Sequence, residues 1–108
     1  MLQGLGSRRV FVYRQVVDMR KSFNGLICLV ESDLKRDSLS GDVFVFSGKR
    51  GNVVKILYFD RTGYCLFMKR LEKGCFQVGN DGKVEQVTHH QLELLLDGLS
   101  VYCVKMRA

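Results

Sequence analysis

The sequence predicts an α+β fold in which an antiparallel meander sheet of about five strands packs, on one face, against one longer N-terminal helix and one short C-terminal helix. Three observations predict it. An amphipathic stripe lies in residues 23–34, β-branched and aromatic residues dominate from residue 42 onward, and glycine-bearing turns divide that region into short segments. With 108 residues and no linker or internal repeat, the chain is expected to form a single domain over residues 1–108.

The N-terminal part predicts a strand followed by the longer helix. Val10–Tyr13 has the composition of a short strand. The helical stripe consists of Phe23, Leu26, Ile27, Val30 and Leu34. We expect this helix to be capped by Asp18 or Ser22 and to end near Lys35. Gly25 weakens it by about 1 kcal/mol relative to Ala, which indicates close packing at that position.

The region from Asp42 onward predicts the meander and the second helix. Its strand-like segments are Val43–Phe46, Val53–Phe59, Tyr64–Leu71, Cys75–Val78 and Lys83–Val87. Short glycine-containing connections of the kind that separate them join antiparallel neighbours. Thr88 is expected to cap a short helix over about residues 89–97 that ends at Gly98. The apolar stripe of that helix is Leu92, Leu95, Leu96 and Leu99.

The net charge of +6 is concentrated in two segments, because residues 8–21 sum to +4 and residues 47–73 sum to +5. A two-residue loop between Asp60 and Gly63 would pair residue 59 with 64, 57 with 66, 55 with 68 and 53 with 70. This hairpin would gather Lys49, Arg50, Lys55, Lys69 and Arg70 at one end. Arg61, in the turn, would lie about 20 Å away at ~3.3 Å per strand residue. Such a patch suits a phosphate backbone, although charge pattern alone balances DNA binding against a solvated basic surface.

The sequence carries no catalytic, metal or membrane signature. The cysteines, which are Cys28, Cys65, Cys75 and Cys103, lie in apolar runs and are expected to be buried, reduced thiols. The longest apolar run, Leu26–Val30, is far shorter than the roughly 20 residues of a spanning helix. We therefore expect a cytoplasmic protein with no metal, cofactor or small-molecule substrate, and not an enzyme. A pair of carboxylates brought together by folding is the enzymatic alternative that the sequence leaves open.

Four motifs in order along the chain resemble one known family. They are Asp18–Leu26 (DMRKSFNGL), Phe44–Gly51 (FVFSGKRG), Val54–Gly63 (VKILYFDRTG) and Phe67–Phe76 (FMKRLEKGCF). Together they are similar to the small TnpB-like accessory protein of bacterial insertion-sequence family sixty-six, over about residues 8–78. That protein is unrelated to the RNA-guided nuclease of the same name. The resemblance implies participation in transposition beside a separately encoded transposase, and it supplies no catalytic residues.

Some positions depart from the family pattern and others match it. Phe59 stands where Trp is common, Cys75 where Arg is common, and Gln77 where a Trp-Pro ending is usual, so no role can depend on an indole there. The matching basic residues are Arg20, Lys21, Lys49, Arg50, Lys55, Lys69, Arg70 and Lys73. Their agreement with the family favours DNA binding over a solvated surface.

The leading hypothesis is a non-catalytic accessory protein that supports transposition by binding DNA through these eight basic residues. The alternative is a protein-interaction module that docks on the transposase or on a second copy of the chain. Its exposed apolar sheet face would consist of Val53, Leu57, Phe59, Tyr64 and Leu66. The sequence predicts neither the oligomeric state nor whether the two basic segments meet in space.

Overall fold

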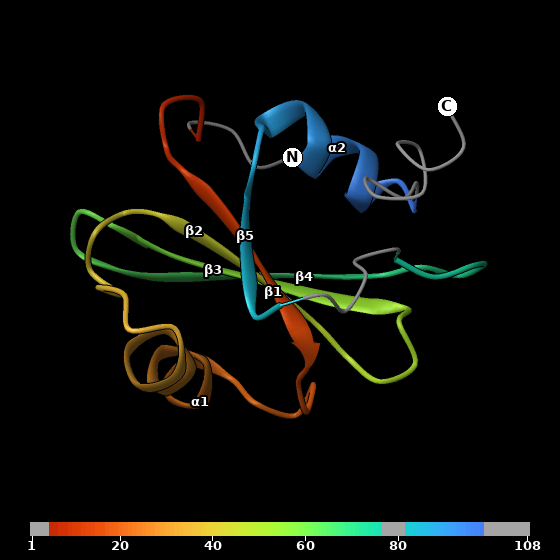
Figure 1. Ribbon diagram of the computed structural model, residues 1–108, viewed down its shortest axis with the longest axis horizontal. Coiled ribbons are helices and arrows are strands. Elements are labelled where there is room, and N and C mark those ends of the chain that lie inside the picture. The colour runs from red at the N-terminus through yellow and green to blue at the C-terminus, as the bar shows by residue number, and fades with distance from the viewer. Residues whose placement is uncertain (1–4, 77–81, 99–108) are drawn as a thin grey trace.

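The computed structural model describes residues 5–76 and 82–98, and it contains a five-stranded mixed sheet between two helices (Figure 1). The elements are β1 (Val10–Val16), α1 (Phe23–Cys28), a π-helical turn η1 (Leu29–Asp33), β2 (Val43–Ser47), β3 (Val53–Asp60), β4 (Gly63–Arg70), β5 (Val84–Val87) and α2 (His89–Leu96). The strand order across the sheet is β4-β3-β2-β1-β5.

The expected antiparallel meander is correct for β2, β3 and β4 but wrong for the whole sheet. β1 pairs with β2 in parallel, because the long connection that contains α1 crosses over and returns the chain in the same direction. β5 pairs antiparallel with β1, where Val87 lies opposite Val10, and so fills the edge that β1 would otherwise leave open. Of the expected strand Cys75–Val78, Cys75 and Phe76 belong to no strand, and the other two residues lie outside the described part of the chain.

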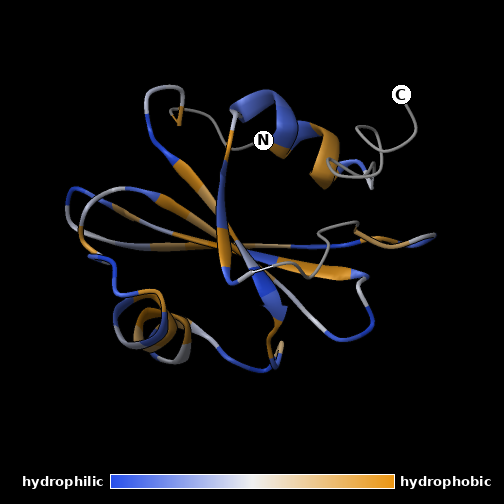
Figure 2. Ribbon diagram, viewed as in Figure 1, coloured by the Kyte–Doolittle hydropathy of each residue, from blue (hydrophilic) through white to orange (hydrophobic). Residues whose placement is uncertain are grey.

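The expectation that both helices cover one face of the sheet is also wrong. Leu26 and Val30 of the α1–η1 segment pack against Phe44 and Phe46 of β2 on one face. On the other face the leucines of α2 pack against a second core cluster that contains Val45. All residues of β2 are buried, so this strand presents apolar side chains to both sides and needs a cover on each. Figure 2 shows hydrophobic residues concentrated along these central strands.

The two helices occupy the expected positions, with two differences in the first: Ser22 lies at its N-cap but forms no side-chain capping hydrogen bond, and its last turn is wider. The expected single helix runs as α1 and then η1, where the Leu34 N–H donates to Leu29 O in a wider turn. For α2, the predicted Thr88 cap is confirmed, because Thr88 Oγ1 accepts from Gln91 N at 3.0 Å and Gln91 Oε1 accepts from Thr88 N at 2.9 Å. Gly98 follows with a φ of +82°, as a C-terminal glycine should. Leu99 lies outside the described residues.

The register of the β3–β4 hairpin is confirmed, and the apolar face assigned to docking is partly covered. Tyr64 pairs with Phe59 and Leu66 with Leu57, as the two-residue loop requires. Leu57 is only 1% exposed, and Tyr64 and Leu66 pack against the core cluster beneath α1. The Tyr64 hydroxyl also lies 2.7 Å from Ser38 Oγ. The chain itself therefore buries Leu57 and covers the rest of this face in part, since Val53, Phe59, Tyr64 and Leu66 are half-buried.

Candidate nucleic-acid interface

The two basic segments of the sequence meet at one end of the sheet. Because β1 and β2 are parallel, the segments that follow them leave the sheet at the same end, and β4 ends there as well. A groove of about 670 Å³ lies at this end of the sheet. Its cationic residues, which define what we term the basic groove, are Arg20, Lys49, Arg50 and Arg70. The other lining residues are apolar or uncharged, apart from Asp18.

Close packing between the β1 and β2 ends brings the cations together. The Val17 N–H donates to Ser47 O at 3.0 Å, which ties the end of β1 to the end of β2. Gly48 follows, and a Cβ atom at this position would lie 2.5 Å from Met19 Cγ. Glycine therefore allows the chain before Arg20 to approach the β2–β3 loop that carries Lys49.

Asp18 orients one of the groove's cations. Its carboxylate accepts from Arg20 Nη2 at 2.7 Å and from the Arg20 backbone N–H at 2.9 Å. These hydrogen bonds lower the pKa of Asp18 to about 2, and the same pair raises the pKa of Arg20. The Arg20 side chain is nevertheless 91% exposed, so its remaining donors face solvent.

The other groove cations differ in their pairing. Arg70 Nε pairs with Glu72 at 3.2 Å, and both side chains are exposed. Lys49 and Arg50 form no ion pair with any residue that the structure describes. These two side chains are the least compensated positive charges of the basic groove.

The remaining four predicted site residues do not line the groove. Lys55 is only 8% exposed, and its Nζ donates to Lys21 O at 2.7 Å. Lys69 Nζ donates to Leu96 O at 2.9 Å, on the face of the sheet that α2 covers, where a cation suits the C-terminal end of a helix. Lys21 and Lys73 are exposed, and they follow Arg20 and Arg70 closely in sequence.

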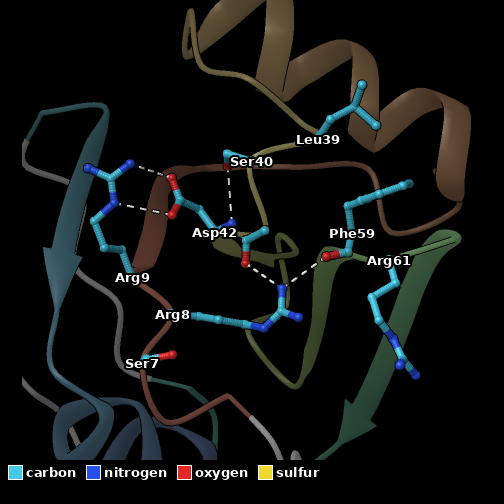
Figure 3. A pocket seen from close by; sticks show the side chains of 9 residues that line it. Ser7, Arg8, Arg9, Leu39, Ser40, Asp42, Phe59 and Arg61 are labelled. Atoms are coloured by element: carbon cyan, nitrogen blue, oxygen red, sulfur yellow. Dashed lines mark hydrogen bonds and ion pairs between the residues drawn. The ribbon is translucent and has the colours of Figure 1, made fainter.

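A second basic pocket, of about 750 Å³, lies at the opposite end of the sheet (Figure 3). We term it the arginine pocket after Arg8, Arg9 and Arg61, which line it. Arg8 Nη1 donates to Gly41 O at 2.8 Å and to Phe59 O at 2.9 Å, and Arg8 Nη2 pairs with Asp60 at 3.1 Å. Arg9 Nε and Nη2 bind the two carboxylate oxygens of Asp42 at 3.1 and 2.8 Å.

This pocket was not predicted from the sequence. Arg61 was expected to lie far from the other cations, and Arg8 and Arg9 were counted in one basic segment with the residues that follow β1. The missing information is the parallel β1–β2 pair, which brings the residues before β1 beside those before β2. A strand-order prediction that placed the α1 connection as a crossover would have supplied it.

Tyr13 and the cysteines within the described residues line neither the groove nor the arginine pocket. Tyr13 donates its hydroxyl proton to Asp33, which also pairs with Lys83 at 3.1 Å. Burial, followed by the hydrogen bond to Asp33, raises the pKa of Tyr13 to about 12. The expectation of buried thiols is wrong for Cys28, which is exposed, and Cys65 and Cys75 are only half-buried; Cys103 lies outside the described residues.

The described residues contain neither a cluster of metal ligands nor a membrane-spanning helix. Within residues 5–76 and 82–98, no group of three or more His, Cys, Asp or Glu side chains could hold a metal ion. Neither helix in that part of the chain is long and apolar enough to cross a bilayer.

Comparison with known proteins gives a consistent family relationship. The family described as IS66 Orf2-like protein matches residues 8–106. The uncharacterized protein y4hO of Sinorhizobium fredii (strain NBRC 101917 / NGR234) is 37% identical over 92 residues, which cover 84% of this chain and 80% of that protein. The uncharacterized protein y4jC of the same organism is 38% identical over 101 residues, which cover 92% of this chain and 86% of that protein. No solved structure matches the chain significantly.

Proposed function

Because this chain belongs to the IS66 Orf2-like family of insertion-sequence accessory proteins, we propose that it supports transposition without catalysing a reaction, by binding DNA through the basic groove. The observation that carries the proposal is the convergence of Arg20, Lys49, Arg50 and Arg70, from two separate segments, on one groove. The proposed setting is the cytoplasm, with the separately encoded transposase as a protein partner. The proposal requires no cofactor or small-molecule substrate.

The charge balance of the groove favours a polyanion. Four cations and one carboxylate line it, and that carboxylate is already bound to Arg20. Like charges gathered in one groove repel one another, and phosphates relieve this repulsion while releasing counterions. Four phosphate contacts predict that log Kobs falls with log salt concentration at a slope of roughly −3.6 for duplex DNA.

The lining of the groove favours duplex DNA over single-stranded DNA. Among the residues that line it, the uncharged ones include Val16, Val17, Met19 and Val53, and none is aromatic. Sequence-tolerant binding of single strands uses aromatic rings on which unpaired bases stack. A groove with cationic groups and no ring is suited to the phosphate backbone, so binding is expected to depend little on sequence.

The test is a charge reversal of the two unpaired cations, Lys49→Glu with Arg50→Glu. Fluorescence anisotropy with a labelled duplex from the element end, and with a random duplex, is measured at two salt concentrations. We expect affinity to fall by at least about tenfold and the salt slope to lose about 2 in magnitude, because two phosphate contacts are lost.

The matched control is Lys35→Glu with Arg61→Glu, which lowers the net charge equally but changes residues that do not line the groove. Circular dichroism establishes that both double variants fold. Wild-type affinity in the groove variant would refute the proposal. An equal loss in the control would mean that overall charge, or the cations at the other end of the sheet, and not the groove, governs binding.

A further inference from the structure

We propose that the arginine pocket docks an acidic, apolar-containing peptide segment of a protein partner, at the end of the sheet opposite the basic groove. The pocket combines cations with exposed apolar surface. Leu39, in its wall, is 55% exposed, and Phe59 beside it is half-buried. Figure 3 shows these side chains around the same opening as the arginines.

Two guanidinium groups in the pocket retain donors for a ligand. Arg9 uses Nε and Nη2 on Asp42, which fixes the plane of the group and leaves Nη1 available, and its side chain is 57% exposed. Arg61 is exposed and forms no ion pair with a residue that the structure describes. The oriented Arg9 guanidinium is suited to a carboxylate, and Arg61, on the other side of the pocket in Figure 3, supplies a second, separate cation.

The balance of charges favours a peptide over DNA at this pocket. Asp60 and Asp42 already compensate Arg8 and Arg9, so Arg61 supplies the excess charge. A duplex presents a continuous row of phosphates, which the single uncompensated charge of Arg61 cannot neutralise, and it gains little from contact with Leu39. A peptide that carries carboxylates and an apolar side chain matches both features of the pocket.

The location makes this site separate from the proposed DNA site. β3 extends for eight residues between the two ends of the sheet, which corresponds to more than about 20 Å at ~3.3 Å per residue. The two sites can therefore be occupied together, and the protein would then link DNA to a protein partner. Peptide docking does not depend on DNA binding, so either proposal can fail alone.

A pair of glycine substitutions provides a matched test. Arg61 and Lys35 both have a positive φ, +47° and +56°, in the left-handed region that favours glycine. Arg61→Gly and Lys35→Gly each remove one positive charge and relieve the backbone, so both variants are expected to fold at least as well as the wild type. Arg61 lines the pocket, whereas Lys35 does not.

The probe is the peptide acetyl-Glu-Leu-Asp-Glu-Leu-Glu-amide, titrated into ¹⁵N-labelled protein and followed by NMR. We expect saturable shifts at the amides of Leu39, Ser40 and Thr62. The Kd should weaken by about fivefold in Arg61→Gly and stay unchanged in Lys35→Gly, because one exposed charge pair is lost. The Lys49→Glu, Arg50→Glu variant should bind the peptide as the wild type does.

Several results would overturn the inference. They are an absence of saturable shifts, shifts confined to the basic groove, or equal weakening in the two glycine variants. Equal binding of a control peptide with Gln in place of each acid would also overturn it, because the carboxylates would then contribute nothing. If a duplex, and not the peptide, shifts the pocket amides, the pocket is a DNA site.

Discussion

The two ends of the sheet both carry clusters of cations, but the cations are used differently. In the arginine pocket, Arg8 donates hydrogen bonds to two backbone carbonyls and to Asp60. In the basic groove, Lys49 and Arg50 are exposed and form no ion pair within the described residues. A cation's role therefore follows from whether its donors are already bound, which the sum of the local charges does not reveal.

The largest expected effect is on stability, at the arginine end. Arg8→Leu should lower the free energy of unfolding by about 2–3 kcal/mol, because it leaves Gly41 O, Phe59 O and Asp60 without their shared donor in a partly buried site. Arg50→Leu, at the other end, should change it by less than about 0.5 kcal/mol. Urea unfolding measures both. Equal effects would remove the distinction between the two ends.

A smaller effect, on the pH dependence of stability, is expected from Tyr13, whose hydroxyl is hydrogen-bonded in the core. The folded-state pKa of Tyr13 is raised from 10.0 to about 12, so its neutral form favours the fold. Stability from this residue is complete below about pH 10 and is lost as the pH rises from 10 toward 12. In Tyr13→Phe that part of the alkaline decline should disappear, while stability at pH 7 falls by about 1 kcal/mol with the lost hydrogen bond to Asp33.

Thermal unfolding between pH 8 and 12 tests this prediction. Burial also raises the pKa of Tyr58, but Tyr58 is present in both proteins, so the difference between them isolates Tyr13. A parallel alkaline decline in the two proteins would contradict the assignment. DNA affinity at pH 7 should be the same for both, because Tyr13 lies in the core beneath α1 and not in the groove.

Local features of the fold were predictable from the sequence, and the long-range pairing was not. A two-residue loop determines which residues face each other, so the β3–β4 register followed from Asp60 and Gly63 alone. Thr88 likewise predicted the start of its helix, where the structure shows a capping box with Gln91. The partner of β5 depends on which strand edge remains open, and no local pattern encodes that. The unbroken apolar run Val43–Phe46 did carry a signal for helices on both faces, because alternation is absent.

Part of the site was also predictable, because it depends on local features of the sequence. Loop residues such as Lys49 and Arg50 are exposed wherever the sheet is placed, so their grouping survived the change in topology. Lys55 shares a face with Leu57, and that face is open or closed according to where α1 packs. Alternation along a strand assigns a side, but it does not say what covers that side.

Within the basic groove we expect a smaller effect, which is an increase in DNA affinity and not a loss. Asp18→Asn should increase DNA affinity by about twofold to threefold, because it removes the carboxylate that lines the groove and compensates Arg20. The pKa of Asp18, about 2, keeps the carboxylate ionised at pH 5–8, so the wild-type affinity should not vary through Asp18 in that range. Anisotropy at pH 5, 6, 7 and 8 measures both properties. Weaker binding by Asp18→Asn would mean that orienting Arg20 matters more than the added repulsion.

The smallest expected effect is at Lys55, the predicted phosphate ligand that the fold buries. Its ammonium donates to Lys21 O, so Lys55→Met should change DNA affinity by less than about twofold. Stability should change by about 1 kcal/mol or less, since the lost hydrogen bond is offset by relief of a buried charge and Met fills a similar volume. Lys49→Met is the matched control, with the same charge change at the groove and an expected loss of about threefold or more in affinity. If the two variants lose affinity equally, Lys55 reaches the DNA in the complex. A cation whose donors are hydrogen-bonded within the fold could then not be classed as structural on that ground.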